Sequence, residues 1–179
     1  MYFLGLRLPD QFDKNEWLIT IVFAVFLFGF FRLPKRLPAA ITVMVFLYTS
    51  FLSRTVDNLL ASGFPVDLYD AADNRYYEWM DVGLWTLVYP LYGYFLVYFY
   101  QSWRGTIYRR MGYLLATSLL SVFFEAIALY LKIFHYKEWN IVLSLLIYPF
   151  LLGSILLFYE SVLRRWIREE KPARTANRS

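Results

Sequence analysis

Five stretches of mostly apolar side chains follow one another along the chain, separated by shorter polar connections. They are Trp17–Phe31, Leu37–Leu52, Val82–Tyr100, Met111–Leu131 and Trp139–Phe158. A helix rises about 1.5 Å per residue and the hydrocarbon core of a bilayer is about 30 Å thick, so one crossing needs about 20 residues. The first two stretches are shorter, but Trp17 and Arg32 extend the first to the interfaces and Arg54 extends the second. The pattern predicts an all-α integral membrane bundle of five transmembrane helices.

Basic residues are concentrated in two of the connections and in the C-terminal segment. These groups are Arg32, Lys35 and Arg36, then Arg104, Arg109 and Arg110, and finally Arg164, Arg165, Arg168, Lys171, Arg174 and Arg178. A path of five crossings places all three groups on one side, and the positive-inside rule makes that side cytoplasmic. The N-terminus is then outside and the C-terminus is cytoplasmic. The connection from Asp57 to Asp81 is rich in acidic residues and has Arg75 as its one cation, which agrees with an outer location.

The basic connection between the first two stretches has the sequence FRLPKRLP. It argues against the alternative that these two stretches form a re-entrant hairpin. A cleavable signal peptide would have small residues after its apolar stretch. The basic connection occupies that place, so the first stretch is not typical of a cleavable signal peptide. Asp13 and Glu16 have the spacing of a capping box at the start of the first helix. We therefore expect the first stretch to remain in the protein as a membrane helix.

The composition of the chain supports lipid as its main solvent. Hydrophobic residues make up 59% and aromatic residues 22% of the 179 residues, against about 45–50% apolar residues in soluble domains. The absence of cysteine excludes disulfides, thiolate catalysis and cysteine-bound metal. The net charge of +4 arises next to apolar stretches, so we expect no nucleic-acid partner. The predicted organisation is a single transmembrane helical domain, residues 1–171, with a disordered cytoplasmic tail, residues 172–179.

The fourth stretch contains a carboxylate, Glu125, near its middle. At intervals of three and four residues it shares one helical face with Ser118, Ser121, Ala128, Lys132 and His135. An ionisable group at a helix centre costs about 2.5–3.5 kcal/mol on insertion scales, so a partner is expected. Arg54 lies at a similar depth on the second stretch, which predicts an Arg54–Glu125 ion pair with Asp57 as a second acceptor. Together with Asp81, these residues form the predicted buried polar centre near the outer leaflet.

Three roles for Glu125 remain open from the sequence. The pair with Arg54 locks two helices together, or it forms an ion or proton site, or Glu125 is protonated and hydrogen-bonded to Ser121 or a tyrosine. Polar side chains that could line a site beside it are Tyr89, Tyr94, Tyr98, Ser121 and His135. The alternative role for the tyrosines is hydrogen bonding between helices.

The third stretch has its own face of small and polar residues, Gly83, Thr86, Pro90 and Gly93. Small residues let helix backbones approach closely in lipid, so we expect this face to pack against the Glu125 face. Pro90 also frees a backbone carbonyl, which a tyrosine hydroxyl or water has to satisfy.

The sequence contains no arrangement typical of a catalytic or metal site. His135 is the only histidine, so it cannot by itself build a typical zinc site. No Ser/His/Asp spacing, HExxH motif or phosphate-binding glycine loop is found. We therefore expect no metal and no cofactor, and we assign no catalytic residue.

Two segments, VDLYDAADNRYYEWMDVGLWTLVYPLYGYFLVYFYQSW and FFEAIALYLKIFHYKEWNIVLSLLIYP, form a distinctive pattern. After an outer loop rich in aspartate and tyrosine, its positions are Asp81, Tyr89, Pro90, Gly93, Tyr94, Phe95, Glu125, Tyr136, Lys137, Trp139, Ser144, Tyr148 and Pro149. In this pattern the chain resembles a family of small multi-span membrane proteins of endospore-forming bacilli and clostridia. The resemblance covers about residues 66–150 and carries no established activity. It implies a multi-pass protein of the bacterial cytoplasmic (inner) membrane, with a link to sporulation.

The leading functional hypothesis from the sequence is a membrane module without enzymatic activity. Its polar centre near the outer leaflet would engage a lipid, a small solute or a partner protein. One alternative is a proton or ion conduit that uses Glu125. Another is an intramembrane enzyme acting on lipid or prenyl substrates, with Asp57, Asp81 or Glu125 as acid, base or metal ligand. The expected partners are the lipid bilayer and either another membrane protein or a second copy of the chain.

Overall fold

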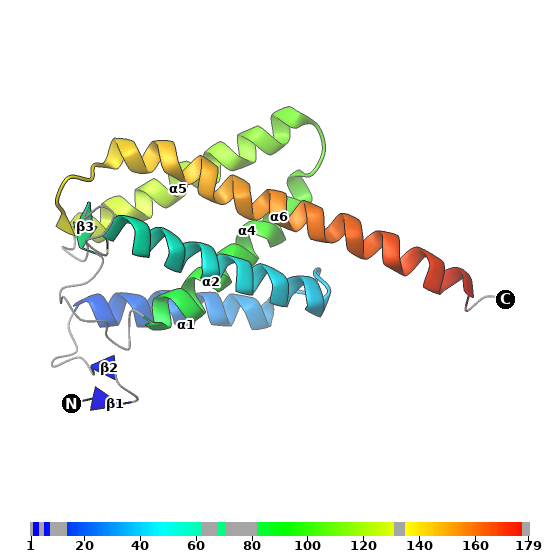
Figure 1. Ribbon diagram of the computed structural model, residues 1–179, viewed down its shortest axis with the longest axis horizontal. Coiled ribbons are helices and arrows are strands. Elements are labelled where there is room, and N and C mark those ends of the chain that lie inside the picture. Colours follow the sequence, from blue (N-terminus) through cyan, green and yellow to red (C-terminus); the bar gives the residue numbers. More distant parts are fainter. Residues whose placement is uncertain are drawn as a thin grey trace.

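Within the residues that the structure describes, five helices run back and forth along one direction in the computed structural model (Figure 1). They are α1 (Lys14–Arg32), α2 (Ala39–Ala61), a third helix composed of the π-helical segment η1 (Leu84–Val88) and α4 (Tyr89–Trp103), α5 (Ile107–Tyr130) and α6 (Ile141–Ala176). The described residues are 2–3, 6–7, 14–61, 68–70, 82–130 and 135–176. The predicted all-α class is confirmed for this part of the chain.

Two pairs of short antiparallel strands accompany the helices in the described part of the chain. β1 (Tyr2–Phe3) pairs with β2 (Leu6–Arg7), and β3 (Tyr69–Asp70) pairs with β4 (His135–Tyr136). The second pair joins the chain that follows α2 to the corner between α5 and α6, so it fastens two helix ends together.

Three of the described helices are long and apolar enough to cross a membrane. The qualifying segments are Ala39–Leu60 of α2, Ile107–Tyr130 of α5 and Ile141–Arg168 of α6. Large apolar side chains point outward and are exposed, for example Phe28 on α1, Phe51 on α2 and Phe150 on α6. Extensive exposed apolar surface is rare in soluble proteins and marks an interaction with lipid or with another protein. The length and composition of these helices therefore agree with a membrane location.

Two helices extend beyond the apolar stretches that predicted them. α2 continues past Leu52 to Ala61, because an established helix gains one hydrogen bond for each residue added and accepts polar residues at its end. α6 continues to Ala176, whereas the sequence predicted a disordered tail from residue 172. Residues 177–179 lie outside the described part of the chain.

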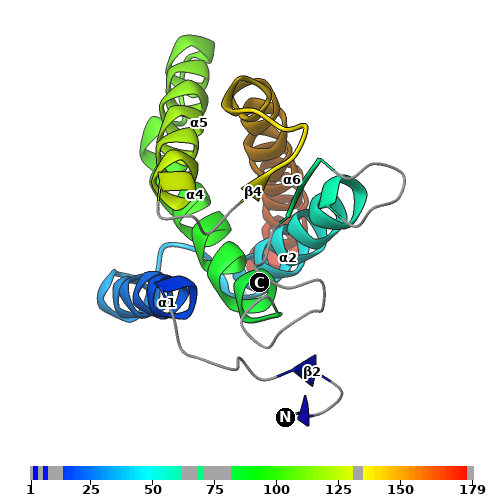
Figure 2. The same cartoon turned by 90° about the vertical axis from the view of Figure 1, so that its left-hand side faces the viewer.

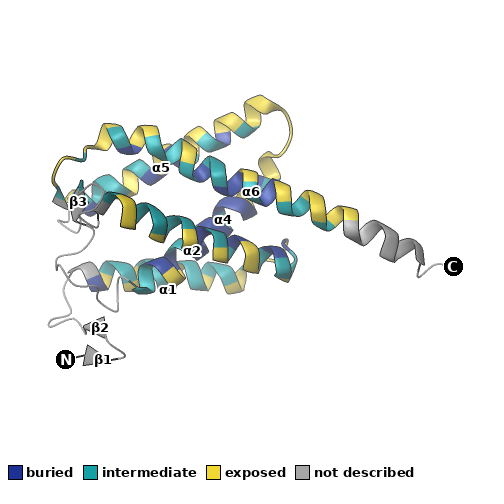
Figure 3. Cartoon of the chain, viewed as in Figure 1, coloured by how far each residue is buried: buried dark blue, intermediate teal, exposed yellow. Residues whose placement is uncertain are grey.

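The central element of the bundle is α4. Figure 2 shows α4 between α1 and α5, with α2 and α6 beside it. The most extensive packing joins α2 to α4 and α5 to α6. Burial follows this arrangement, because α4 is buried along most of its length whereas the outward faces of α5 and α6 are exposed (Figure 3). The polar groups of α4 can therefore be satisfied only by its neighbouring helices.

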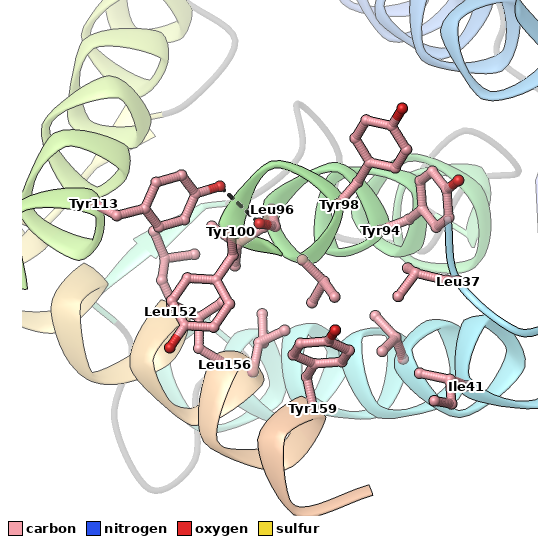
Figure 4. Close-up of a cluster of buried hydrophobic side chains, with 13 residues drawn as sticks. Leu37, Ile41, Tyr94, Leu96, Tyr98, Tyr100, Tyr113, Leu152, Leu156 and Tyr159 are labelled. Atoms are coloured by element: carbon pink, nitrogen blue, oxygen red, sulfur yellow. Dashed lines mark hydrogen bonds between the residues drawn. The ribbon is translucent and has the colours of Figure 1, made fainter. Parts of the chain in front are cut away.

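Tyrosine side chains form much of the core where α4 meets the other helices (Figure 4). Tyr113 of α5 points toward α4 and donates its hydroxyl to the Leu96 carbonyl at 2.6 Å. Tyr94 is 1% exposed, and its ring packs edge-on against Phe30 and Phe46. Tyr113 therefore connects α5 to α4 by a hydrogen bond. Tyr94 packs through its ring, and its buried hydroxyl has no partner among the described residues, so it does not make the hydrogen bond between helices that the sequence left open for it.

Gly93 sets the distance between α4 and α2. A Cβ atom at this position would lie 2.9 Å from Cγ2 and 3.0 Å from Cβ of Thr49 in α2, and it would also collide with the Thr49 hydroxyl. The sequence predicted that Gly93 would face the Glu125 side of α5, but the close approach that glycine permits is made by α2. The spacing of small residues identified a packing face without identifying which helix covers it.

The carbonyl freed by Pro90 is satisfied by a serine from a neighbouring helix. Tyr89 donates its N–H to the Leu84 carbonyl, five residues back, as in a π-helix. Pro90 has no N–H, so the Trp85 carbonyl cannot receive the next hydrogen bond of this series. Ser50 of α2 donates its hydroxyl to that carbonyl at 2.9 Å. The sequence predicted that the freed carbonyl needs a donor. It predicted a tyrosine hydroxyl or water as that donor, whereas the structure has Ser50.

Replacing Gly93 by alanine should lower the stability of the protein in detergent. The added methyl group would collide with Thr49, and overpacking of this kind costs about 1–3 kcal/mol. Gly112→Ala is the matched control, because nothing lies within 4 Å of a Cβ atom there and alanine is the better helix former. Thermal unfolding followed by circular dichroism compares the two variants with the natural protein. Equal midpoints for the two variants would contradict the close approach of α2 and α4.

Candidate functional site

Glu125 lies at the centre of a hydrogen-bonded group near the end of α5. Its Oε1 atom accepts a hydrogen bond from the Tyr136 hydroxyl at 2.5 Å and another from Ser144 Oγ at 2.7 Å. Tyr136 belongs to β4, and Ser144 is a buried residue in the first turn of α6. The carboxylate therefore joins α5 to the corner that leads into α6.

The start of α6 holds Ser144 in position. Trp139 Nε1 donates to Ser144 Oγ at 2.7 Å, so this oxygen accepts one hydrogen bond while its own hydrogen goes to Glu125. Asn140 caps the helix, because its Oδ1 atom accepts the amides of two residues in the first turn at 3.0 Å. We call the group formed by Glu125, Tyr136, Trp139 and Ser144 the Glu125 centre.

Backbone hydrogen bonds fasten this corner to the end of α2. The carbonyl of Leu68, next to β3, accepts the amides of residues 137–139 at 3.0–3.1 Å. The amide of Leu68 in turn donates to the Leu60 carbonyl of α2 at 2.8 Å. Tyr136 immediately precedes the residues that make these hydrogen bonds, and its own backbone pairs with Tyr69 of β3. The backbone of this corner therefore holds Tyr136 in place.

The second carboxylate oxygen of Glu125 has no hydrogen-bond partner among the described residues. Oε2 is buried, and no donor reaches it with hydrogen-bonding geometry. The Tyr148 hydroxyl of α6 lies beside the Glu125 carboxylate, close enough for both an electrostatic and a hydrogen-bonding interaction, but it does not meet the geometry of a hydrogen bond to Oε2. A buried polar atom without a partner is costly. Oε2 thus keeps an acceptor position that no described donor fills.

The predicted Arg54–Glu125 ion pair is absent between these two described residues. Arg54 is exposed, and its guanidinium lies 5.2 Å from the centre of the Trp85 ring. The same indole donates its Nε1–H to Asp57 Oδ2 at 2.6 Å. Arg54 and Asp57 therefore contact η1, while Glu125 faces the corner between α5 and α6. Arg54 and Glu125 were expected at a similar depth in the bundle, but depth does not determine on which side of the bundle a residue lies. Glu125 accepts a hydrogen bond from a tyrosine, Tyr136, which is one of the partners that the sequence left open.

The small-residue face of α5 is buried, with Ser118, Ser121 and Ala128 turned into the bundle. The Ser121 hydroxyl lies 2.7 Å from the Tyr92 hydroxyl of α4. Because Ser121 donates its own hydrogen to the Thr117 carbonyl at 3.0 Å, Tyr92 is the donor in this contact. Ser121 thus joins α5 to α4 without contacting the Glu125 carboxylate.

The other predicted site residues have different surroundings. Tyr94 and Tyr98 belong to the hydrophobic core, and Tyr89 is partly buried at the start of α4. Asp81 and the side chain of His135 lie outside the part of the chain that the structure describes. Of the predicted polar centre, the structure therefore brings Arg54 and Asp57 together at Trp85 and places Glu125 elsewhere.

The sequence reasoning did not assign Tyr136, Trp139 or Ser144 to the site of Glu125. All three residues occur in the pattern on which the family resemblance rests. That pattern is the feature of the sequence that could have linked them to Glu125. Tyr136 is 11 residues and Ser144 is 19 residues from Glu125, too far for one turn of a helix. A helical hairpin brings such positions together, because its two helices are antiparallel neighbours.

The environment of Tyr136 keeps its hydroxyl protonated. Burial raises the pKa of this phenol above its ordinary value, and the hydrogen bond to the Glu125 carboxylate raises it further, while the contact with Ser144 acts in the opposite direction. Tyr136 is therefore a hydrogen-bond donor throughout the physiological pH range. Its role fits that of a fixed support for the carboxylate.

Neither a metal nor a known relative assists the interpretation of the Glu125 centre. Among the residues described by the structure, no three His, Cys, Asp or Glu side chains are placed to hold a metal ion. Comparisons of the chain with protein-family models, curated proteins and solved structures gave no match.

Tyr136→Phe should destabilise the protein by about 1–3 kcal/mol, the usual cost of removing one partner of a buried hydrogen bond. The natural control is Tyr130→Phe, since Tyr130 of α5 is 86% exposed and should tolerate loss of its hydroxyl. Thermal unfolding in one detergent gives both effects. If the two variants melted together, the hydrogen bond from Tyr136 to Glu125 would not support the fold.

Proposed function

We propose that the chain crosses the membrane five times, with its N-terminus outside and its C-terminus in the cytoplasm. Successive helices run in alternating directions, so the α1–α2 and α4–α5 connections lie at the same end (Figure 1). A hydrogen bond of 3.4 Å from Arg36 to Ser102 links these two regions. Both connections are basic, and basic connections face the cytoplasm. The family resemblance adds the bacterial cytoplasmic membrane as the proposed location.

Five crossings require that α1 and the third helix, composed of η1 and α4, also span the membrane, in addition to α2, α5 and α6. α1 has 19 residues, and the third helix runs unbroken from residue 82 to residue 103. Each is about 30 Å long by helical rise, which matches the hydrocarbon thickness. The exposed apolar side chains of α1, such as Phe28 and Phe31, suit contact with acyl chains.

The proposed activity is binding: the Glu125 centre holds the hydrogen-bond donor of a lipid, a small solute or a partner protein. The observation that carries this proposal is the contrast between the two oxygens of Glu125. Oε1 accepts two hydroxyl groups, whereas the buried Oε2 has no donor among the described residues. An N–H or O–H group, or an amine cation, would complete the carboxylate. In the proposed orientation this site lies near the outer leaflet.

The geometry favours binding over the two alternatives. A conduit needs polar groups connected along the whole thickness of the bundle, whereas Ser121 of the next turn bonds to Tyr92 and to its own helix and has no hydrogen bond to Glu125. An enzyme needs an acid, a base or a metal positioned against a substrate, and the described partners of Glu125 serve to fix it in place. Binding requires only the acceptor that the structure contains.

Glu125→Gln should release a bound component from protein that is isolated together with its surrounding lipid. The carboxamide retains one oxygen for Tyr136 and Ser144, but its NH₂ group cannot accept a donor at the Oε2 position. Natural protein and variant are extracted from the same membranes in polymer nanodiscs, and mass spectrometry quantifies the lipids, small molecules and proteins that accompany each. The loss of a hydrogen bond to a charged group predicts a decrease of about tenfold or more in that component.

Glu138→Gln is the matched control, because Glu138 is an exposed carboxylate in the same corner. A component that the Glu138 variant keeps and the Glu125 variant loses supports the binding site. Identical components in all three preparations contradict it. Proton or ion flux in liposomes is measured in parallel, and flux that disappears in Glu125→Gln would favour the conduit.

The proposed orientation predicts the labelling of single cysteines. The chain contains no cysteine, so each introduced thiol is the only one. A membrane-impermeant maleimide added to intact cells should label Glu138→Cys and should not label Gly105→Cys in the α4–α5 connection until the membrane is permeabilised. The reverse pattern would invert the orientation, and labelling of both sites in sealed cells would contradict the number of crossings between them.

A further inference from the structure

Arg54 is the only cation of helix α2, and it lies within the segment of α2 that is long and apolar enough to cross a membrane, Ala39–Leu60. By helical rise, about 9 Å of helix separates it from the end of that segment. Its side chain is exposed, and no ion pair joins it to a carboxylate among the described residues. Hydrocarbon cannot solvate a guanidinium, so a long arginine side chain near a helix end extends to polar groups at the interface. Arg54 therefore requires an acceptor at this end of α2.

Trp85 of η1 holds the Arg54 guanidinium in place. The guanidinium carbon lies 5.2 Å from the centre of the indole ring, a distance at which the ring stabilises a cation. The indole is itself fixed, because its Nε1–H donates to Asp57 Oδ2 at 2.6 Å and the Trp85 carbonyl accepts the Ser50 hydroxyl at 2.9 Å. An indole ring supplies no oxygen acceptor for the five N–H groups of a guanidinium. The contact with Trp85 therefore positions the cation and leaves its need for oxygen acceptors unmet.

Apolar side chains continue from Arg54 along the same face of α2. Val43, Leu47 and Phe51 precede it at intervals of four and three residues, which places all four positions on one side of the helix. These three side chains are 56%, 66% and 67% exposed. From Val43 to Arg54 the helix rises about 16 Å, close to half of the hydrocarbon thickness of a bilayer. This face therefore fits a molecule with an anionic group at one end and an acyl chain at the other.

We propose that Arg54 binds the phosphodiester group of a phospholipid whose acyl chain lies along Val43, Leu47 and Phe51. The oxygens of a phosphodiester match the planar fork of a guanidinium. Trp85 is a positioning residue, since it contacts the guanidinium and not the lipid. In the proposed orientation the lipid belongs to the outer leaflet.

This site rests on the proposed crossing of the membrane by α2, but it is separate from the proposed binding at Glu125. The Glu125 centre presents an acceptor, whereas Arg54 presents donors and a positive charge. The two sites therefore take different chemical groups. Glu125→Gln should leave the phospholipid at Arg54 in place.

Native mass spectrometry of the full chain tests the proposal. The protein is equilibrated in detergent with an equimolar mixture of phosphatidylglycerol and diacylglycerol that carry the same acyl chains, and the retained lipids are counted. Arg54→Gln should retain one phosphatidylglycerol molecule fewer per protein than the natural chain, with diacylglycerol unchanged. Arg54→Lys should give an intermediate result, because an ammonium group keeps the charge without the fork.

Arg168→Gln is the control for charge, since it removes one positive charge from an exposed position of α6. It should retain as much phosphatidylglycerol as the natural chain. Equal losses in Arg54→Gln and Arg168→Gln would reduce the effect to general attraction and overturn the site. Unchanged retention in Arg54→Gln overturns it as well, and a lower midpoint of thermal unfolding in that variant would then assign Arg54 to the fold.

Phe51→Ala tests the path of the acyl chain without a change of charge. It should lower the retention of phosphatidylglycerol several-fold, whereas Phe150→Ala, at a position of α6 that is 77% exposed, should not. If the Arg54 variants do not fold, this pair decides the matter, because equal retention in the two phenylalanine variants overturns the proposal.

Competition separates a phospholipid from a free phosphate. Inorganic phosphate and glycerol 3-phosphate are added in large excess over the phosphatidylglycerol. Retention of the lipid that depends on Arg54 in their presence supports a site for the whole phospholipid. Complete displacement of that lipid by either soluble anion would mean that Arg54 recognises free phosphate, and the assignment to lipid would fail.

Discussion

Where a polar atom inside this bundle finds no partner in its own helix, a side chain of a neighbouring helix has to satisfy it, because the outward side chains are apolar. The Trp85 carbonyl shows the consequence: Pro90 cannot serve it, and Ser50 of α2 donates to it at 2.9 Å. Tyr113 of α5 reaches the Leu96 carbonyl of α4 in the same way. Each of these contacts fixes the rotation of one helix against α4. The central position of α4 therefore rests on hydrogen bonds as well as on close packing at Gly93.

Glu125 and Glu160, two carboxylates of the described helices, have different surroundings. Glu160 meets the Arg104 guanidinium, which satisfies both of its oxygens, as expected for a buried ion pair that stabilises packing. Glu125 meets hydroxyl groups on one oxygen and nothing among the described residues on the other. Of the two, Glu125 is therefore the carboxylate with an oxygen that no described donor satisfies.

The helices were largely predictable because their signal is local: about 20 apolar residues between polar connections specify a helix of membrane length. The partners of Glu125 were not, because depth along a helix does not specify which neighbour lies beside it. Arg54 has a comparable depth, yet the contact of its guanidinium with Trp85 holds it at η1. Glu160 received no assignment, since it falls just after the apolar stretch that ended at Phe158. Contacts between helices depend on shape, as at Gly93 and Thr49, and that information is distributed over the whole chain.

The corner between α5 and α6 explains how a short segment can control the Glu125 centre. Among the described residues, Tyr136 and Ser144 donate to the carboxylate and Trp139 donates to Ser144. The corner is itself held by Asn140 at the start of α6 and by the Leu68 carbonyl, which belongs to the chain after α2. The Leu68 carbonyl therefore connects the end of α2 to the corner that supplies the donors of Glu125 Oε1, although Glu125 and Arg54 of α2 do not form an ion pair.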